Sequence, residues 1–299
     1  MIIFDYTKNI FLDRGFKKAR IFLLRSLLSY SEVINWLKYI DSFYKKYGFN
    51  FAPSELAALP IRSYVSNIFR IKQRNLILQD HYKIMESVFS PLAIKKFLSD
   101  SEISISSILK KNGDQCHLKI LMHGKFWREG AMTLYLQDES CKLISTLTFT
   151  IHNDLNGKKS IFIGGLQGGS DIEKSDIVSF TRSLGGLRPK HTLIECCYAI
   201  AKFIEAEKII GVSNENHVFS YQKTFQKSYN SIWEEIGSTL DGDKNYLLPK
   251  YLIKRDFESV PQKKRKDWLI RHAHIDKLTV DIDNFLKENS NNTFKSTCF

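Results

Sequence analysis

The sequence lacks the cysteine and histidine spacing of a disulfide framework or a metal site. Its five cysteines are an odd number, and Cys196 and Cys197 are adjacent within a run typical of a helix. The eight histidines do not cluster, and His272 and His274, two residues apart, would point in different directions on a helix. We therefore expect free thiols, a reducing compartment and no metal.

Long apolar runs are also absent. No stretch approaches the roughly 18 apolar residues of a transmembrane helix, and the first twenty residues do not have the pattern of a signal peptide. The chain has no internal repeat and no low-complexity tract. Its 299 residues, 43% hydrophobic and 25% charged, are ordinary for a globular protein with a sizeable core. These features predict a cytoplasmic location.

Acidic residues are few relative to basic ones. The chain has 32 Asp and Glu against 44 Lys and Arg, a net charge of +12. Such a charge favours nucleic acid, an anionic membrane surface or an acidic protein as partner, although a basic proteome background explains it equally well. The basic amphipathic segment 15–46 would lie on an anionic surface at the inner membrane, or pack on its own domain. The basic run 263–266 has few interleaved aromatic residues, so nucleic acid is not favoured.

Hydrophobic periodicity changes along the chain from helical to alternating and back. Helical spacing predicts helices over 15–46, 54–70 and 73–99, the last broken near Ser90-Pro91. After the turn signal Asn112-Gly113-Asp114, four strands are predicted as an antiparallel meander, with Asn156-Gly157 as the last hairpin turn; they cover 117–123, 131–137, 142–151 and 159–165.

The remaining elements complete a mixed architecture. A helix over 171–184 with Asp171 as its N-cap, a second helix opening at Leu187–Lys190 and a short strand over 208–214 indicate a crossover. A short amphipathic turn over 231–237 and a long helix over 261–288 follow. The predicted fold class is α+β: N-terminal helices, then a mixed, mainly antiparallel sheet flanked by helices, and a helical C-terminus. We divide the chain into an N-terminal helical region (1–110), a mixed α/β core (111–289) and a flexible tail (290–299).

Four of the 15 glycines lie within six positions, in Gly164-Gly165-Leu166-Gln167-Gly168-Gly169. The segment is predicted to join a strand to a helix, where unpaired amides and the helix dipole favour an anion such as a phosphate. It lacks the ending of a P-loop and the acidic residue of a dinucleotide fingerprint. Gln167 and the glycines are similar to the loop on which GNAT-type acyltransferases hold the pyrophosphate of coenzyme A. A glycine-rich turn without a ligand is the alternative.

Two further segments carry candidate functional residues. Arg188 and Lys190 flank Pro189 at the start of a helix, where an external anion would relieve their repulsion from the dipole, unless they reach solvent or Glu195. After the strand over 208–214, His217 is a candidate general base, with Ser213 or Glu215 nearby. A structural histidine at a turn is the other interpretation.

The sequence contains a series of short blocks that are specific when taken in order: His81-Tyr82, Gly165–Gly168, Leu184–Lys190, Val212-Ser213-Asn214-x-x-His217, Trp233-Glu234-Glu235, Leu248-Pro249 and Val260–Arg265. Together these blocks resemble the VirK/YbjX family over roughly residues 50–285. The pattern Tyr229-Asn230-Ser231-Ile232-Trp233 departs from a more acidic family pattern, which weakens any role for a carboxylate at position 230.

The resemblance implies a Gram-negative cell-envelope setting, with links to virulence, surface display of an outer-membrane protein and antimicrobial-peptide resistance, and implies no established reaction. Joined to the GNAT-like loop, it suggests an acyltransferase. Coenzyme A or an acyl carrier protein would be the donor and an envelope precursor or protein amine the acceptor. Gly165, Gln167, Gly168 and Gly169 would hold phosphates, Arg188 and Lys190 further anionic groups, and His217 would accept the proton.

Three interpretations can be separated by geometry. An enzyme predicts a cleft where 159–165 and 208–214 diverge, with Gln167 and His217 on the same side of the sheet. A membrane-surface or partner-binding factor predicts one basic face joining 17–25 and 263–271. A post-transcriptional regulator predicts exposed aromatic residues beside that face.

Overall fold

The computed structural model of the chain describes residues 2–99, 102–111, 113–122, 124–223, 225 and 228–291. Three sequence predictions therefore lie outside the described residues: the tail from residue 292, Asn112 of the predicted turn and His123 of the predicted strand.

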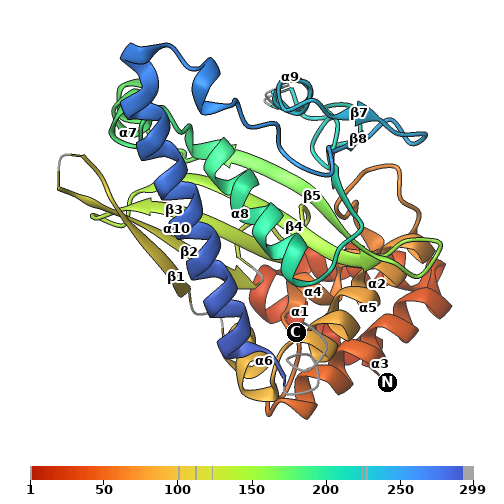
Figure 1. The fold of residues 1–299 in the computed structure, drawn as a ribbon. Coiled ribbons are helices and arrows are strands. Elements are labelled where there is room, and N and C mark those ends of the chain that lie inside the picture. Colours follow the sequence, from red (N-terminus) through yellow and green to blue (C-terminus); the bar gives the residue numbers. More distant parts are fainter. Residues whose placement is uncertain are drawn as a thin grey trace.

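Within the described residues, eight strands form one sheet in the order β1-β2-β3-β4-β5-β6-β8-β7 (Figure 1). Neighbouring strands are antiparallel except β5 and β6, which run parallel and are joined by a helical crossover. Alternating and β-branched residues form the long strands, and the central ones are buried on both faces. The strands are β1 (Ile103–Leu109), β2 (Gln115–Met122), β3 (Met132–Asp138), β4 (Leu143–Asn153), β5 (Lys159–Gly168), β6 (Lys208–Gly211), β7 (Thr239–Leu240) and β8 (Tyr246–Leu247).

In the part of the chain that the structure describes, six α-helices precede the sheet. They gather in the lower part of Figure 1. Of these, α5 packs along β4. One buried hydrophobic cluster extends from Ile3 in α1 through the sheet to Leu286 near the end of the chain, so these helices share their core with the sheet. The helices are α1 (Ile2–Arg14), α2 (Phe16–Leu28), α3 (Tyr30–Lys46), α4 (Ser54–Ala57), α5 (Ile71–Val88) and α6 (Pro91–Leu98).

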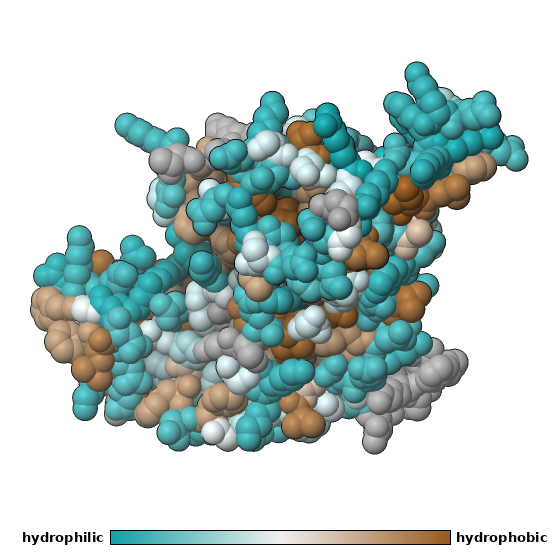
Figure 2. Space-filling view, turned by 90° about the vertical axis from the view of Figure 1, so that its left-hand side faces the viewer, coloured by the Kyte–Doolittle hydropathy of each residue, from teal (hydrophilic) through white to brown (hydrophobic). Residues whose placement is uncertain are grey.

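The later helices lie against the sheet and over its end. α8 (Pro189–Phe203) packs on β4 and β5, and α10 (Arg265–Asn289) packs on α8 and β1, so both cross the same face in Figure 1. α7 (Lys174–Ser183) precedes α8, and α9 (Tyr229–Glu235) precedes β7. Hydrophilic side chains cover most of the face shown in Figure 2, with hydrophobic ones in small groups between them.

The predicted fold class is confirmed, with N-terminal helices, a mixed and mainly antiparallel sheet flanked by helices, and a helical C-terminus. Cys116, Cys196 and Cys197 are free and buried, and Cys141 is free and exposed. None of the helices in the described ranges is both long and apolar enough to cross a membrane.

Several predicted elements have different bounds. The predicted helix over 54–70 is wrong, because helix α4 is followed by a 3₁₀ turn at Leu59–Ile61 and then by extended chain in which Val65 has φ 61°. Asp171 is not an N-cap; α7 begins at Lys174 with Glu173 as its cap. The strand predicted over 208–214 ends at Gly211. The sequence prediction missed α1 and β1, and β1 lies within the range expected to be helical.

The glycine-rich segment is mainly part of a strand and not the ligand-binding loop expected from the sequence. Three of its four glycines, Gly164, Gly165 and Gly169, leave space for atoms of other parts of the protein. β5 extends through Gly168, and Gly164 is the extra residue of a bulge opposite Thr148 and Phe149. A Cβ on Gly164 would lie 2.0 Å from the Glu129 carbonyl oxygen, and one on Gly165 would lie 2.0 Å from Glu129 Oε2. Gly164 and Gly165 thus allow another segment to lie directly on the strand.

We expect Gly164→Ala to destabilise the fold by about 3 kcal/mol, because the added methyl group meets backbone atoms that cannot move independently. Gly168→Ala is the matched control: a Cβ there meets no atom within 4 Å. That variant should unfold within about 0.5 kcal/mol of the parent protein. Urea unfolding of the three proteins measures both effects, and equal stability of the two variants would contradict the close approach.

A buried histidine joins α5 to the sheet beyond the end of β3. His81 is completely buried, and its Nδ1 accepts a hydrogen bond from the Ile151 N–H of β4 at 3.3 Å. Burial lowers the pKa of His81 to about 3, because the charged ring would lose its hydration. The neutral ring is therefore the folded form at neutral pH.

His81 makes stability depend on pH with a defined sign. Between pH ~6.5, where the unfolded histidine titrates, and its lowered folded pKa, the unfolded chain binds one more proton, so stability falls as the pH falls. His81→Gln, whose amide oxygen can accept the same hydrogen bond, should reduce the slope of the unfolding free energy by about 1.4 kcal/mol per pH unit in that window. Urea unfolding at several pH values measures the slope. Parallel profiles would show that His81 is not neutral in the fold.

Candidate functional site

A cavity of about 590 Å³ lies where β5 and β6 separate. The two strands are paired only over Ser160–Ile163 and Lys208–Gly211; beyond this, β5 continues alone to Gly168. The far end of β5 and the turn after β6 form part of the cavity wall, as the enzyme interpretation predicts. The lining residues are Arg14, Glu55, Arg62, Lys125, Phe126, Trp127, Arg128, Glu129, Leu166, Gln167, Gly168, Lys190, His217, Phe219, Gln222, Phe225, Ser228 and Tyr229.

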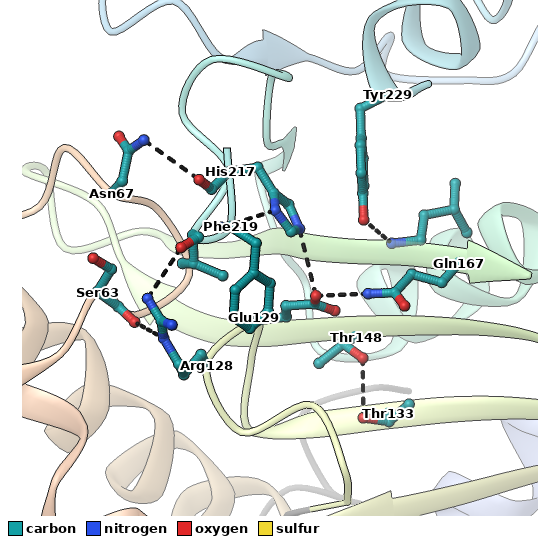
Figure 3. Close-up of polar contacts among 12 residues, drawn as sticks. Ser63, Asn67, Arg128, Glu129, Thr133, Thr148, Gln167, His217, Phe219 and Tyr229 are labelled. Atoms are coloured by element: carbon teal, nitrogen blue, oxygen red, sulfur yellow. Dashed lines mark hydrogen bonds and ion pairs between the residues drawn. The ribbon is translucent and has the colours of Figure 1, made fainter. Parts of the chain in front are cut away.

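Glu129 is the central polar group of this cavity (Figure 3). It lies at the end of the turn between β2 and β3, where its N–H donates to the Phe126 carbonyl, and only 1% of its surface is exposed. Its Oε1 accepts a 2.6 Å hydrogen bond from Gln167 Nε2 and lies 3.5 Å from His217 Nε2. Oε2 has no hydrogen-bond partner among the described residues.

Burial raises the pKa of Glu129, while His217, Gln167 and Arg128 act in the opposite direction. Desolvation is the largest effect, because a carboxylate in a nearly dry site loses its hydration shell. A carboxyl whose pKa is raised by burial and one of whose oxygens has no partner is suited to accept a proton.

The hydrogen bonds of His217 define its tautomer. Nδ1 accepts from the Phe219 N–H at 3.2 Å, so the proton of the neutral ring is on Nε2, facing Glu129. The ring is 1% exposed and lies between Phe225, stacked at 4.5 Å, and Tyr229 at 4.8 Å between centroids. The Nε2–H of His217 therefore faces the Glu129 carboxylate without forming a hydrogen bond to it, and the ring has no free lone pair.

Tyr229 completes the arrangement from α9. Its hydroxyl oxygen accepts a hydrogen bond from the Leu166 N–H at 3.3 Å, and burial raises the pKa of Tyr229. The phenol consequently stays protonated at neutral pH, and its own hydrogen is available to a ligand in the cavity.

The segment after the 3₁₀ turn, which contains Val65 and Asn67, connects the N-terminal helices to the site by hydrogen bonds. Val65 N–H donates to the Arg128 carbonyl, and Asn67 Nδ2 donates to the carbonyls of Glu215 and His217. The Arg128 guanidinium donates to the carbonyls of Ser63 and Val218 (Figure 3). These contacts hold the turn bearing Glu129 against the turn bearing His217.

The cavity wall carries more positive than negative charge. Arg14, Arg62, Lys125, Arg128 and Lys190 line it against Glu55 and Glu129, and Arg14 is paired with Glu55 at 3.3 Å.

Of the other four cations, Arg128 donates to backbone carbonyls and Lys125 is exposed. The partly buried Arg62 and Lys190 form no ion pair with any described residue. Burial lowers the pKa of Lys190 and, together with nearby arginines, that of Arg62. Partly buried cations without counter-ions favour an anionic ligand.

The structure brings four predicted site residues together: Gln167, Gly168, Lys190 and His217 all line the cavity. Gln167 and His217 contact the same carboxylate oxygen, so they lie on the same side of the sheet.

Five predicted site residues lie elsewhere. Gly165 lies beneath Glu129 Oε2, and the Gly169 N–H donates to the Ile144 carbonyl. The remaining three, Arg188, Ser213 and Glu215, do not line the cavity.

These three residues have partners of their own. Arg188 pairs with Glu235 beside a second cavity. Ser213 Oγ accepts from the Asn216 N–H, and Glu215 Oε2 accepts from Asn230 Nδ2 at 3.4 Å. The contacts of Ser213 and Glu215 are those of residues that shape the turn after β6, whereas Arg188 lies at the start of α8.

The expected anion site at the start of the helix after β5 is already occupied by protein. The Glu173 side chain accepts from the N3 backbone of α7, and Asp176 accepts from the Glu173 N–H at 3.2 Å. This capping box satisfies two of the amides that were expected to receive a phosphate, and it places two carboxylates where the anion was expected.

Sequence reasoning missed Glu129, Arg62 and Tyr229 as parts of one site. The run Trp127-Arg128-Glu129-Gly130 has the composition of an exposed turn, and the glycines that indicate a close approach are more than 30 residues away. No group of three or more potential metal ligands occurs among the described residues.

The two basic segments expected to join into one face are separated. In Figure 1, α2 lies at the lower right and the start of α10 at the upper left. The face joining 17–25 and 263–271, expected of a membrane- or RNA-binding factor, is therefore not formed.

Comparison with known proteins places the chain in a family. The model of a family described as "Protein of unknown function (DUF535)" matches residues 13–284. The uncharacterised protein YbjX of Escherichia coli K12 is 27% identical over 274 residues, which are 88% of this chain and 81% of YbjX. An uncharacterised protein of Haemophilus influenzae is 26% identical over 146 residues, 48% of this chain and 47% of that protein.

A solved structure, a cAMP-binding acyltransferase from Mycobacterium smegmatis, aligns with 65% of this chain and 58% of its own at 10% identity and a TM-score of 0.31. A match at this level supports no conclusion about fold or activity. The family match and the YbjX relative, in contrast, cover nearly the whole chain and agree with the resemblance seen in its sequence blocks. The chain belongs to the DUF535 family, to which its VirK/YbjX-like motifs pointed.

Proposed function

We propose that the protein is an acyltransferase that uses a thioester of coenzyme A or of an acyl carrier protein as donor. The observation that carries the proposal is the convergence of Gln167 and His217 on the buried Glu129 carboxylate, in a cavity lined by unpaired cations. The phosphate groups of coenzyme A or phosphopantetheine match those cations. The cell-envelope setting implied by the VirK/YbjX resemblance favours an envelope precursor or a protein amine as acceptor, in the cytoplasm or at the inner membrane.

In the proposed reaction, some site residues transfer protons and others position the reacting groups. The acceptor amine or hydroxyl attacks the thioester carbonyl, and Glu129 Oε2 accepts its proton. The tetrahedral intermediate collapses with cleavage of the C–S bond, and the leaving thiolate receives the proton that Glu129 took from the acceptor, directly or through solvent. The Tyr229 hydroxyl donates a hydrogen bond to the leaving sulfur and stays protonated.

His217 is assigned a positioning role in place of the general-base role expected from the sequence. With its Nδ1 bonded to the Phe219 N–H and its Nε2–H facing Glu129, it holds the carboxylate and has no free base. Arg62 and Lys190, not Arg188 and the α7 N-terminus, would hold the phosphates, because they line the same cavity as Glu129.

Donor binding should depend on the cations of the cavity. Native mass spectrometry with coenzyme A, long-chain acyl-coenzyme A and acyl carrier protein measures it. We expect Lys190→Ala and Arg62→Ala each to weaken binding by roughly tenfold, the usual effect of losing one charge-assisted contact. Arg188→Ala is the matched control, because Arg188 is paired with Glu235 at another cavity. Weaker binding in that control alone would place the donor at the second cavity.

Turnover should depend on the Glu129 carboxylate. With acyl-coenzyme A and a panel of amines and hydroxylated lipids as acceptors, Glu129→Gln should lower the rate of thiol release by ~100-fold or more, while donor binding is kept. Glu215→Gln, which removes a carboxylate outside the cavity, should react at the parent rate. Donor binding without turnover in the parent protein would contradict an enzyme and favour a non-catalytic binding factor in envelope display.

A further inference from the structure

The helical hairpin formed by α1 and α2 exposes an unusual number of large apolar side chains. Leu12 is 69% exposed, Phe16 67% and Leu28 86%. Of the 22 exposed large hydrophobic residues of the described chain, nine lie within positions 4–30. The nine are Phe4, Phe11, Leu12, Phe16, Ile21, Leu24, Leu27, Leu28 and Tyr30.

All of these side chains except Tyr30, which begins α3, lie on the outer side of the hairpin. The two helices pack on each other and are joined at Gly15, which has φ 83°. In α2 the core-facing side is narrow, with Ala19, Phe22 and Ser26 buried. A helix that only covered a core would carry polar residues on its other side, whereas here that side is rich in leucine and phenylalanine.

The same outer surface is basic. Lys8, Lys17, Lys18, Arg20 and Arg25 are exposed on the two helices. The acidic residues in the two helices are Asp5 and Asp13, which leaves an excess of three positive charges beside Arg14, whose charge is paired with Glu55. Apolar side chains mixed with lysine and arginine are typical of helices that lie in the interface of an anionic bilayer.

We propose that the α1–α2 hairpin seats the protein on an anionic phospholipid surface. The leucines and phenylalanines would enter the acyl-chain boundary, and the lysines and arginines would contact lipid phosphates. A second copy of the chain fits less well, since a two-fold contact through this surface would bring its excess positive charges against one another. Lipid phosphates supply both the missing negative charge and an apolar layer.

The α1–α2 hairpin adjoins the cavity that contains Glu129. Arg14, the last residue of α1, lines the cavity, and Arg25 of α2 donates to the Ile61 carbonyl next to Arg62. The hairpin therefore forms part of the cavity wall. If the proposed acyl transfer holds, docking would place the site next to lipid-borne substrates, although vesicle binding itself requires no activity.

Vesicle co-sedimentation of the full chain tests the proposal. The parent protein should bind vesicles of phosphatidylglycerol and phosphatidylethanolamine, and bind much less to phosphatidylcholine or in high salt. Leu27→Glu combined with Leu28→Glu should lower the partition coefficient by about a hundredfold, because two buried leucines are lost. Both positions are exposed, so the variant should retain its thermal unfolding midpoint.

A matched control distinguishes binding through the hairpin from nonspecific binding by exposed apolar residues elsewhere. Leu155→Glu combined with Ile253→Glu changes two residues that are 107% and 87% exposed elsewhere, and should bind as the parent does. Equal binding of the hairpin variant and the parent, or equal binding to neutral vesicles, would overturn the proposal. Sedimentation velocity tests the alternative. If the parent protein does not bind vesicles but forms a dimer that the hairpin variant does not form, the surface is a contact with a second copy of the chain.

Discussion

The buried carboxylate of Glu129 is the constraint on which the centre of this structure depends. A charged or polar group at 1% exposure must find partners or space within the protein. Gln167 donates a hydrogen bond to the Glu129 carboxylate, and His217 is fixed in the tautomer whose N–H faces that carboxylate. At positions 164 and 165 only glycine fits, because Glu129 atoms occupy the space that a Cβ would fill. An apolar residue at position 129 would need none of these features, so their joint presence argues that the carboxylate has a use beyond stability.

The fold brings these groups together through long-range connections. Glu129 follows β2, Gln167 ends β5 and His217 follows β6, and the segment around Val65 leaves the N-terminal helices to close the site. A valine with φ 61° is strained, and it persists because its N–H is bonded to the Arg128 carbonyl and its carbonyl faces Gly164. The N-terminal helices therefore do more than cover the sheet, since one strained turn between them fixes the position of the catalytic candidate.

The sequence predicted the fold class and the place of the site better than the site's chemistry. Alternation and the Asn156-Gly157 turn identified four of the long strands, and the alternation in Ile103–Leu109 carries the signal of β1 that went unused. The glycine segment was expected to cradle a phosphate, but a local sequence does not tell whether a glycine faces a ligand or another part of the chain. Glu129 was missed for the same reason: its burial is created by residues distant in sequence. The residues predicted around the crossover, Gln167 and His217, met because parallel pairing of β5 and β6 brings the far end of β5 and the turn after β6 to one place.

The charges of the cavity and of the hairpin point to a common kind of ligand. Lys190 opens α8, where the helix dipole disfavours a cation, and no described carboxylate pairs with it or with Arg62. Such an arrangement costs free energy, and an anion bound beside both cations would offset that cost. The same excess of positive charge continues onto α1 and α2, which share Arg14 with the cavity wall. The amphipathic, phosphate-bearing ligands proposed for the cavity and for the hairpin would each meet positive charge beside apolar side chains, and Arg14 connects the two places.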